Sequence, residues 1–428
     1  MQIEWSAAER AFQEEVRAFL QANLTDELRT AGRLMTSVYC EHAASMQWQR
    51  VLHEKGWAAP AWPTEYGGCD WTAAQHYIFA CERAAACAPP LSPMGIQMCA
   101  PALVAFGTAE QKQFFLPRML SGEHLWCQGY SEPQSGSDLA SLQMAAVEDG
   151  NEFVCTGSKI WTTHATEANW IFCLVRTSRE QRPQLGITFL LIDLSSPGIE
   201  IKPIVSSAGE HIQNQIFFSS VRVPRTNVVG QVGAGWTVAK YLLEFERGGV
   251  AYSPELKARL AELREFAASA PAERQPPSAE RGPAPAECGP RSDERQSLLD
   301  DPLFAARLAA ASIRVAALEV FELQALCRIS AGGSPGSSAS VMKIIGTELR
   351  QHVTELALEA AGHYGRAYQP QAGHPGGRVC LRYADGDAVG PTQAALAPLR
   401  YFNERAGSIY AGSNEIQRNI LAKSALGL

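Results

Sequence analysis

Two short stretches in the middle of the chain concentrate side chains that could hold a flat, polar ligand. The stretch WCQGYSEPQSGSDLAS (126–141) combines hydroxyls, an amide and glycines. The stretch GSKIWTTHA (157–165) places two threonines next to Trp161. The first offers many hydrogen-bond donors to the edge of a heteroaromatic ring, and an indole can cover the face of such a ring. Each stretch alone is equally typical of a serine-rich loop or a core tryptophan.

A third stretch lies close to the C-terminus and reads SIYAGSNEIQRNI (408–420). It is a turn of small residues that leads into the start of a helix. Its central position, Ala411, carries no side-chain chemistry.

Other motifs favour no alternative chemistry. VGQVGAGWTV has G-x-G at Gly233 and Gly235 but lacks the third glycine of a dinucleotide-binding fingerprint. Ser340 and Lys343 form S-x-x-K without its partner motifs, and Ser131 lacks the second glycine of a nucleophile elbow. A Rossmann fold and a serine hydrolase are both poorly supported.

Composition restricts the class of protein. The 428 residues are 46% hydrophobic and 19% charged, which is typical of a globular protein of two or three domains. The net charge of -7 predicts no nucleic-acid partner. The acidic N-terminal stretch predicts no export signal, and runs such as ITFLLIDL fall short of the ~20 residues of a membrane span, so no membrane association is expected.

Cysteine and histidine spacing bears on metals and location. The 11 cysteines never form C-x-x-C, and the 9 histidines never form H-x-x-x-H. We therefore expect no metal site, no disulfide framework and a reducing, cytoplasmic location.

Three regions with different patterns of apolar residues must position these stretches. Apolar residues at helical spacing predict an N-terminal helical domain over 1–125. Short β-branched and aromatic runs predict a β domain over 126–235, and helical spacing returns over 236–428. Within the last region, the Pro- and Ala-rich segment 268–296 predicts a loop between two helices.

Together the motifs resemble the acyl-CoA dehydrogenase family. S-E-P-x-S-G-S-D, W-x-T and Y-x-G-[ST]-x-E-I-Q-R occur in the family's order, with GTAEQKQFFLPRMLSGE, VRVPRTNVVGQVGAGW and YLLEFERGG between them. The resemblance covers nearly the whole chain apart from the Pro-rich segment. It implies an α+β fold with an N-terminal helical domain, a central β-barrel or sandwich domain and a C-terminal four-helix bundle.

The resemblance also implies FAD as cofactor, in a cleft shared between subunits. The helix start after the small-residue turn would offer N–H groups and a positive dipole end to it. The residues that match the family's FAD contacts are Gln128, Tyr130, Ser131, Gly136, Ser137, Trp161, Thr163, Ser413 and Glu415.

The implied reaction is α,β-dehydrogenation of an acyl-CoA to a trans-2-enoyl-CoA. A carboxylate removes the α-proton, and many members carry that glutamate where this chain has Ala411. Glu246, before Arg247, resembles the E-R pair that supplies the base in isovaleryl-CoA and long-chain acyl-CoA dehydrogenases. We therefore expect Glu246 to be the base, with the Ala411 N–H on the thioester carbonyl. The positions that match substrate contacts are Ser137, Glu244, Arg247 and Gly412.

One family element is absent, because no R-x-x-F-G stretch supplies the arginine that reaches the FAD pyrophosphate of a neighbouring subunit. Arg328 or Lys343 are possible substitutes. The expected partners are an electron-transfer flavoprotein and either a homotetramer or a heterotetramer with a homologue. Two alternatives are a subunit of low activity that completes a partner's flavin site, and an acyl-CoA oxidase.

Overall fold

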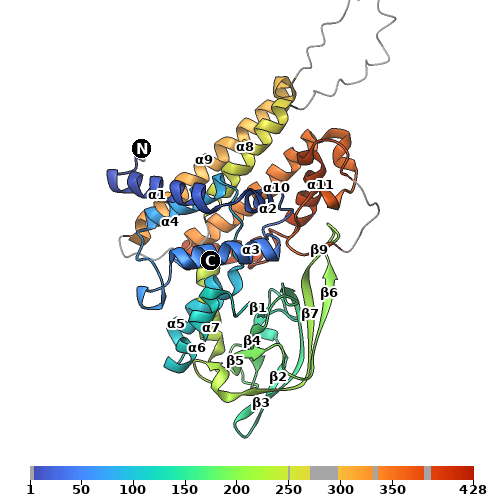
Figure 1. Ribbon diagram of the computed structural model, residues 1–428. Coiled ribbons are helices and arrows are strands. Elements are labelled where there is room, and N and C mark those ends of the chain that lie inside the picture. The colour runs from blue at the N-terminus through green and yellow to red at the C-terminus, as the bar shows by residue number, and fades with distance from the viewer. Residues whose placement is uncertain (1–3, 249–250, 270–296, 331–335, 380–386) are drawn as a thin grey trace, which may run out of the picture.

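The computed structural model describes residues 4–248, 251–269, 297–330, 336–379 and 387–428. In Figure 1 the blue N-terminal helices lie beside the yellow-to-red C-terminal helices, and the green strands form the lower part of the molecule. The predicted order of helices, then strands, then helices is confirmed. The boundaries at 125/126 and 235/236 stay a prediction as borders of independent domains. Of the predicted loop, residues 268 and 269 belong to a helix and 270–296 lie outside the described residues.

The N-terminal helices begin at hydroxyl caps and pack around aromatic residues. Ser6, Thr72 and Thr108 each accept a hydrogen bond from the backbone N–H three residues later, which satisfies a donor that the helix cannot. Phe12 and Trp48 are buried in the core beneath them. The helices are α1 (Ala7–Asn23), α2 (Asp26–Arg33), α3 (His42–Lys55), α4 (Ala73–Ala85), α5 (Ala100–Phe106) and α6 (Ala109–Ser121), with a π-helical segment η2 (Met94–Cys99) before α5.

The described strands form one sheet with the order β6-β7-β3-β2-β4-β5-β8, in which β1 also pairs with β4 and β9 with β7. Runs that are buried at every position, such as ITFLLI in β5, are covered on both faces, whereas β7 alternates buried and half-buried positions. The strands are β1 (Trp126–Gly129), β2 (Ala145–Asp149), β3 (Glu152–Thr163), β4 (Trp170–Arg176), β5 (Ile187–Asp193), β6 (Ile199–Val205), β7 (Glu210–Pro224), β8 (Val228–Val229) and β9 (Arg378–Val379).

The C-terminal helices share a second core, which contains Leu256, Leu308 and Leu356. Helix α7 instead packs its apolar face, including Val238 and Leu242, on the sheet and on the N-terminal core. The helices are α7 (Gly235–Gly248), α8 (Ser253–Ser269), α9 (Pro302–Ser330), α10 (Ser338–Ala360), α11 (Thr392–Glu404) and α12 (Asn414–Leu421).

A buried carboxylate from α9 holds the start of α8. Glu322 accepts hydrogen bonds from the backbone N–H groups of Tyr252, at 2.6 Å, and Ser253, at 3.2 Å, and from the Ser253 hydroxyl. The Tyr77 hydroxyl of α4 adds contacts of 2.9 Å to Ser253 Oγ and 3.0 Å to Glu319 Oε1. The joint between α7 and α8 is therefore tied to both α9 and the N-terminal helices.

We expect Glu322→Ala to destabilise the protein by about 1–3 kcal/mol for each buried donor that loses its acceptor. The thermal unfolding midpoint measures the loss. Gln324→Ala, at an exposed position of the same helix, is the matched control and should change stability by less than about 0.5 kcal/mol. Equal midpoints for the two variants would contradict this role of Glu322.

Candidate flavin and acyl-CoA site

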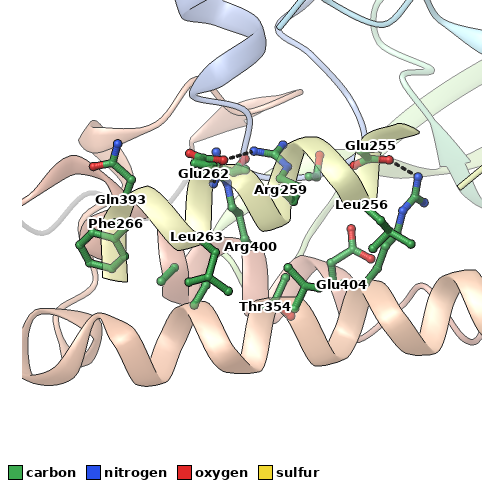
Figure 2. Close-up of a pocket in the computed structure, with 16 residues that line it drawn as sticks. Glu255, Leu256, Arg259, Glu262, Leu263, Phe266, Thr354, Gln393, Arg400 and Glu404 are labelled. Atoms are coloured by element: carbon green, nitrogen blue, oxygen red, sulfur yellow. Dashed lines mark hydrogen bonds and ion pairs between the residues drawn. The ribbon is translucent and has the colours of Figure 1, made fainter. Parts of the chain in front are cut away.

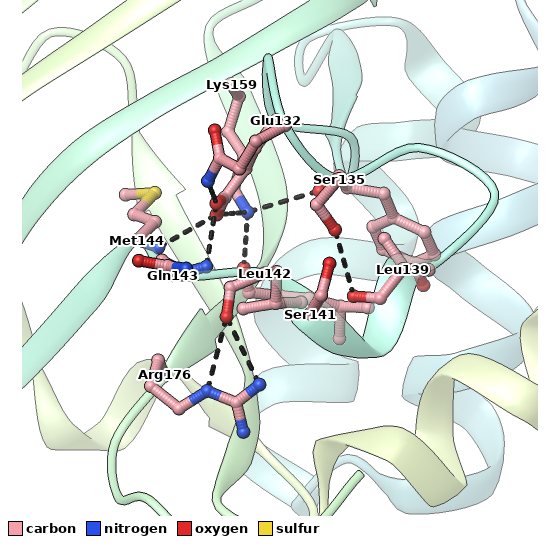
Figure 3. Close-up of polar contacts among 12 residues, drawn as sticks. Glu132, Ser135, Leu139, Ser141, Leu142, Gln143, Met144, Lys159 and Arg176 are labelled. Atoms are coloured by element: carbon pink, nitrogen blue, oxygen red, sulfur yellow. Dashed lines mark hydrogen bonds and ion pairs between the residues drawn. The ribbon is translucent and has the colours of Figure 1, made fainter. Parts of the chain in front are cut away.

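A buried ion pair fixes the loop that follows β1 (Figure 3). Lys159 on β3 is fully buried, and its Nζ donates to Glu132 Oε1 at 2.8 Å. The same ammonium donates to the carbonyls of Leu174, at 2.7 Å, and Tyr130, at 3.2 Å. All three ammonium donors therefore have acceptors, which a buried lysine requires.

The carboxylate of this pair also organises the far end of the loop. Glu132 accepts the backbone N–H groups of Gln143, at 2.7 Å, and Met144, at 2.8 Å. Arg176 on β4 donates to the carbonyls of Ala140, at 2.7 Å, and Leu142, at 3.1 Å. Figure 3 shows these contacts converging on one loop. The loop 130–144 is thus held by charged groups at both ends.

The predicted FAD contacts in this loop occupy different environments. Gln128 is half-buried on β1, and the Tyr130 ring is buried edge-on against Phe172. Ser131 accepts the backbone N–H of Ile160 at 2.9 Å, so the loop is joined to β3. Gly136 and Ser137 are exposed at the tip of the loop.

Trp161 is the most unusual residue of β3. It has a positive φ of 61°, a conformation that is strained for an aromatic residue, and its side chain is 60% exposed. The pairing of β3 with β7 is irregular between Lys159 and Thr162, so the strand bulges at this point. Thr163, next to the bulge, is buried. The strand therefore presents the large aromatic face of Trp161 to solvent, and the backbone of this residue is held in a strained conformation.

The small-residue turn is a left-handed bend. Ala411 has φ 55° and Gly412 has φ 78°, and Ser413 caps α12 by accepting the Ile416 N–H. Among the described residues, the N–H of Ala411 has no acceptor. Glu415 is exposed in the first turn of α12, where hydrogen bonds from its own backbone N–H and from Ser413 lower its pKa.

Buried polar groups of α10 hold this turn in place. Gln417 accepts from Ser340 Oγ at 2.8 Å and donates to the Gly412 carbonyl at 3.3 Å. Lys343 is buried and donates to Asn414 Oδ1 at 2.9 Å. This use of Lys343 supports the start of α12, and Arg328 is exposed and bonded to its own helix at the Gln324 carbonyl.

Glu244, Glu246 and Arg247 lie near the end of α7, and their side chains are outside the described part of the structure. The backbone places Glu246 one helical turn after the fully buried Leu242. Their predicted roles stay predictions.

Sequence reasoning missed the residues that support the site. It named the neighbours Ser131 and Trp161, but not Glu132 and Lys159. The available signal was a lysine in an otherwise strand-like run and a glutamate shortly after a strand that ends at Gly129, because charges in such places need partners. Lys159 and Glu132 are 27 positions apart, and the sequence alone does not show which charges pair across such a separation.

Within the described residues, no group of His, Cys, Asp and Glu is arranged to hold a metal ion. None of the helices in that part of the chain has both the length and the apolarity required to cross a membrane.

Comparison with known families identifies the class. The acyl-CoA dehydrogenase N-terminal, middle and C-terminal domains match residues 6–123, 127–221 and 286–426. The chain therefore belongs to the acyl-CoA dehydrogenase family and is an enzyme of that family, whose members are FAD-binding flavoproteins. This confirms the resemblance and the fold that it implied.

Individual relatives extend over the full length. The chain is 34% identical to the acyl-CoA dehydrogenase IpdE1 of Mycobacterium tuberculosis over 97% of each sequence. It is 30% identical to the acyl-CoA dehydrogenase FadE26 of the same organism over 100% of this chain and 99% of that one. Among solved structures, the ChsE4-ChsE5 complex of Mycobacterium tuberculosis has a TM-score of 0.77 at 28% identity, covering 100% of this chain and 99% of that one.

We expect Lys159→Met to destabilise the protein by about 3–5 kcal/mol, because it leaves the Glu132 carboxylate buried without its cation. The thermal unfolding midpoint measures the loss. The double variant Lys159→Met/Glu132→Gln should recover part of it, since it removes the uncompensated charge.

The control for this prediction is Arg222→Met on β7. Arg222 pairs with Glu152 at 2.7 Å, but its side chain is 55% exposed. Its loss should change stability by less than about 1 kcal/mol. A Lys159 variant as stable as the Arg222 variant would contradict the importance of the buried pair.

Proposed function

We propose that this protein is an FAD-dependent dehydrogenase that converts an acyl-CoA thioester to the trans-2-enoyl-CoA and passes the electrons to an electron-transfer flavoprotein. The observation that carries the proposal is the exposed, strained Trp161 beside Thr163, at the place where the resemblance expects the flavin. A cytoplasmic location accords with the cysteines of the described residues, which are all free.

The residues of this chain fit FAD on physical grounds. The Trp161 indole offers an aromatic face of the size of a fused ring. The loop 130–144 offers hydroxyls and backbone groups, and the ion pair of Glu132 with Lys159 holds it against β3. The N-terminus of α12, with Ser413 and Glu415, offers further polar contacts. When bound, FAD would accept the β-hydrogen of the substrate as hydride.

The chain's own residues would handle the proton and the thioester. Glu246 would take the α-proton onto its carboxylate, and the free N–H of Ala411 would donate a hydrogen bond to the thioester carbonyl oxygen, where negative charge develops. The left-handed backbone at Ala411 and Gly412 suits this role, because it turns a peptide N–H away from the regular pattern. Glu244, Arg247, Ser137 and Gly412 would contact the CoA arm.

A heteromeric assembly is the second part of the proposal. Two similar solved structures are named as pairs, the ChsE4-ChsE5 complex and the Tcur3481-Tcur3483 steroid ACAD, the latter with a TM-score of 0.78 at 26% identity. The chain also lacks the R-x-x-F-G arginine that would reach a neighbour's FAD. Both observations favour a heterotetramer with a homologue over a homotetramer, and a steroid-type acyl-CoA among the substrates to be tried.

We expect Glu246→Gln to lower the rate of enoyl-CoA formation by roughly 10²–10⁴-fold, because glutamine keeps the shape but cannot accept the proton. Turnover with a dye acceptor and the visible flavin absorbance are measured together, and flavin content should not change. Glu265→Gln, at an exposed position of α8, is the control. Full activity of Glu246→Gln would reject Glu246 as the base.

We expect flavin retention to depend on assembly. The chain expressed with a homologous partner should purify yellow with stoichiometric flavin, and Trp161→Ala in the same assembly should lose flavin more readily during gel filtration. A colourless chain that gains flavin and activity only with its partner would favour the structural-subunit alternative. Hydrogen peroxide formed at the rate of turnover would favour an oxidase.

A further inference from the structure

A charged cavity of about 60 Å³ lies within the C-terminal helices, apart from the loop 130–144 (Figure 2). It is several times larger than the ~10–15 Å³ that one water needs. Helices α8, α10 and α11 form most of its wall, with Thr36 and Ser37 at one side. Six of its lining residues are charged: Glu255, Arg259, Glu262, Arg350, Arg400 and Glu404.

Most of these charges are already paired. Glu255 binds the Arg350 guanidinium through Nη2. Glu262 binds Arg400 at 3.1 Å and Arg259 at 3.1 Å. With all six groups ionised, three positive charges balance three negative ones, so the cavity has no excess positive charge for an anion.

Three buried polar atoms of lining residues are left over: Thr36 Oγ1, Arg350 Nε and Glu404 Oε2. Glu404 Oε2 and Arg350 Nε are both buried, and neither has a hydrogen-bond partner among the described residues. Glu404 is only 8% exposed, and burial raises its pKa although the nearby Arg350 opposes the rise. Figure 2 shows the Glu404 carboxylate in the space between α8 and the helix that carries Thr354. Unpaired buried groups of this kind destabilise the folded protein unless a ligand or solvent pairs with them.

The cavity adjoins the turn that contains Ala411. A Cβ atom on Gly407 would lie 3.1 Å from Glu404 Oε2 and 3.8 Å from the Tyr410 hydroxyl. Tyr410 directly precedes Ala411, and its pKa is raised first by burial and then by the charge of Glu404. Glu404 Oε2 therefore lies close to the side chain that precedes the turn that is proposed to bind the thioester.

We propose that this cavity receives a hydroxyl group carried by the acyl chain, which donates to Glu404 Oε2 and accepts from Arg350 Nε. The inference rests on the proposed acyl-CoA dehydrogenase function and adds a substrate class to it.

A hydroxyl fits Glu404 Oε2 and Arg350 Nε better than the other common substituents of an acyl chain do. An alkyl end would leave both atoms unpaired, and a ketone would leave Glu404 without a donor. A carboxylate would place a further negative charge beside Glu404 in a cavity whose charges already balance. A hydroxyl both donates and accepts. Glu404 thereby becomes a specificity-determining residue.

The test compares pairs of acyl-CoA esters that differ only in one hydroxyl, moved outward along the chain and including a steroid-type pair. Two readouts are taken on the flavin-loaded protein, kcat/KM for enoyl-CoA formation and binding of the corresponding enoyl-CoA products by calorimetry. We expect the protein to prefer one hydroxylated ester by at least about tenfold. Glu404→Leu should lose this preference, so that kcat/KM for the hydroxylated ester falls to the value for the unsubstituted ester.

Two further variants serve as controls. Glu404→Gln keeps a carbonyl acceptor and should retain part of the preference, which covers the case in which Glu404→Leu does not fold. Glu359 is an exposed residue of α10 that pairs with Arg307 of α9. Glu359→Leu should leave the preference unchanged.

The outcomes separate the two proposals. Equal kcat/KM for every pair, or a preference that survives in Glu404→Leu, overturns the hydroxyl site and leaves the dehydrogenase proposal intact. Protein that binds no acyl-CoA and forms no product refutes the proposed function and the hydroxyl site with it. A hydroxyl preference in binding without turnover supports the site and counts against the catalytic role.

Discussion

The buried pair of Lys159 and Glu132 is the constraint on which the candidate flavin site depends. It brings a strand and the loop after another strand to one place, and the ammonium donates to three oxygens, Glu132 Oε1 and the carbonyls of Tyr130 and Leu174. Because a buried charge without its partner is expensive, the loop has few alternative positions. The position of Ser131 against Ile160, and of the bulge at Trp161, follows from this anchoring.

The C-terminal turn is held by a separate network and contributes geometry instead of side-chain chemistry. Ala411 lies in a left-handed conformation and Gln417, Ser340 and Lys343 keep it there. Many family members have a glutamate at this position. This chain has Ala411 there and keeps the left-handed bend without the carboxylate. Under the proposed mechanism, the backbone N–H and the proton acceptor are therefore two separable parts of the reaction.

The fold could be predicted from the sequence because its signals are local. The spacing of Phe12, Val16 and Leu20 predicts the first helix, and the unbroken apolar run of β5 predicts a buried strand. Candidate site residues could be named only where motifs match a family, as at Trp161 and Ser413, and their roles stay predictions. Glu132, Lys159, Arg350 and Glu404 could not be found in this way, since their partners lie far along the chain and pairing depends on tertiary packing. The strained φ of Trp161 is likewise set by strand register, which residue type does not reveal.

The Tyr77 hydroxyl has a consequence for communication within the molecule. It bridges Ser253 and Glu319, and so connects α4 to the joint that immediately follows the helix bearing Glu246. Any ligand that shifts this joint by a fraction of an ångström must also disturb a hydrogen bond in the N-terminal helices. If a protein that docks on α4 and distorts Tyr77 changes the affinity for that ligand by some factor, the ligand changes the affinity for the docked protein by the same factor. The N-terminal helices are therefore linked through Tyr77 to the start of α8 and to α9.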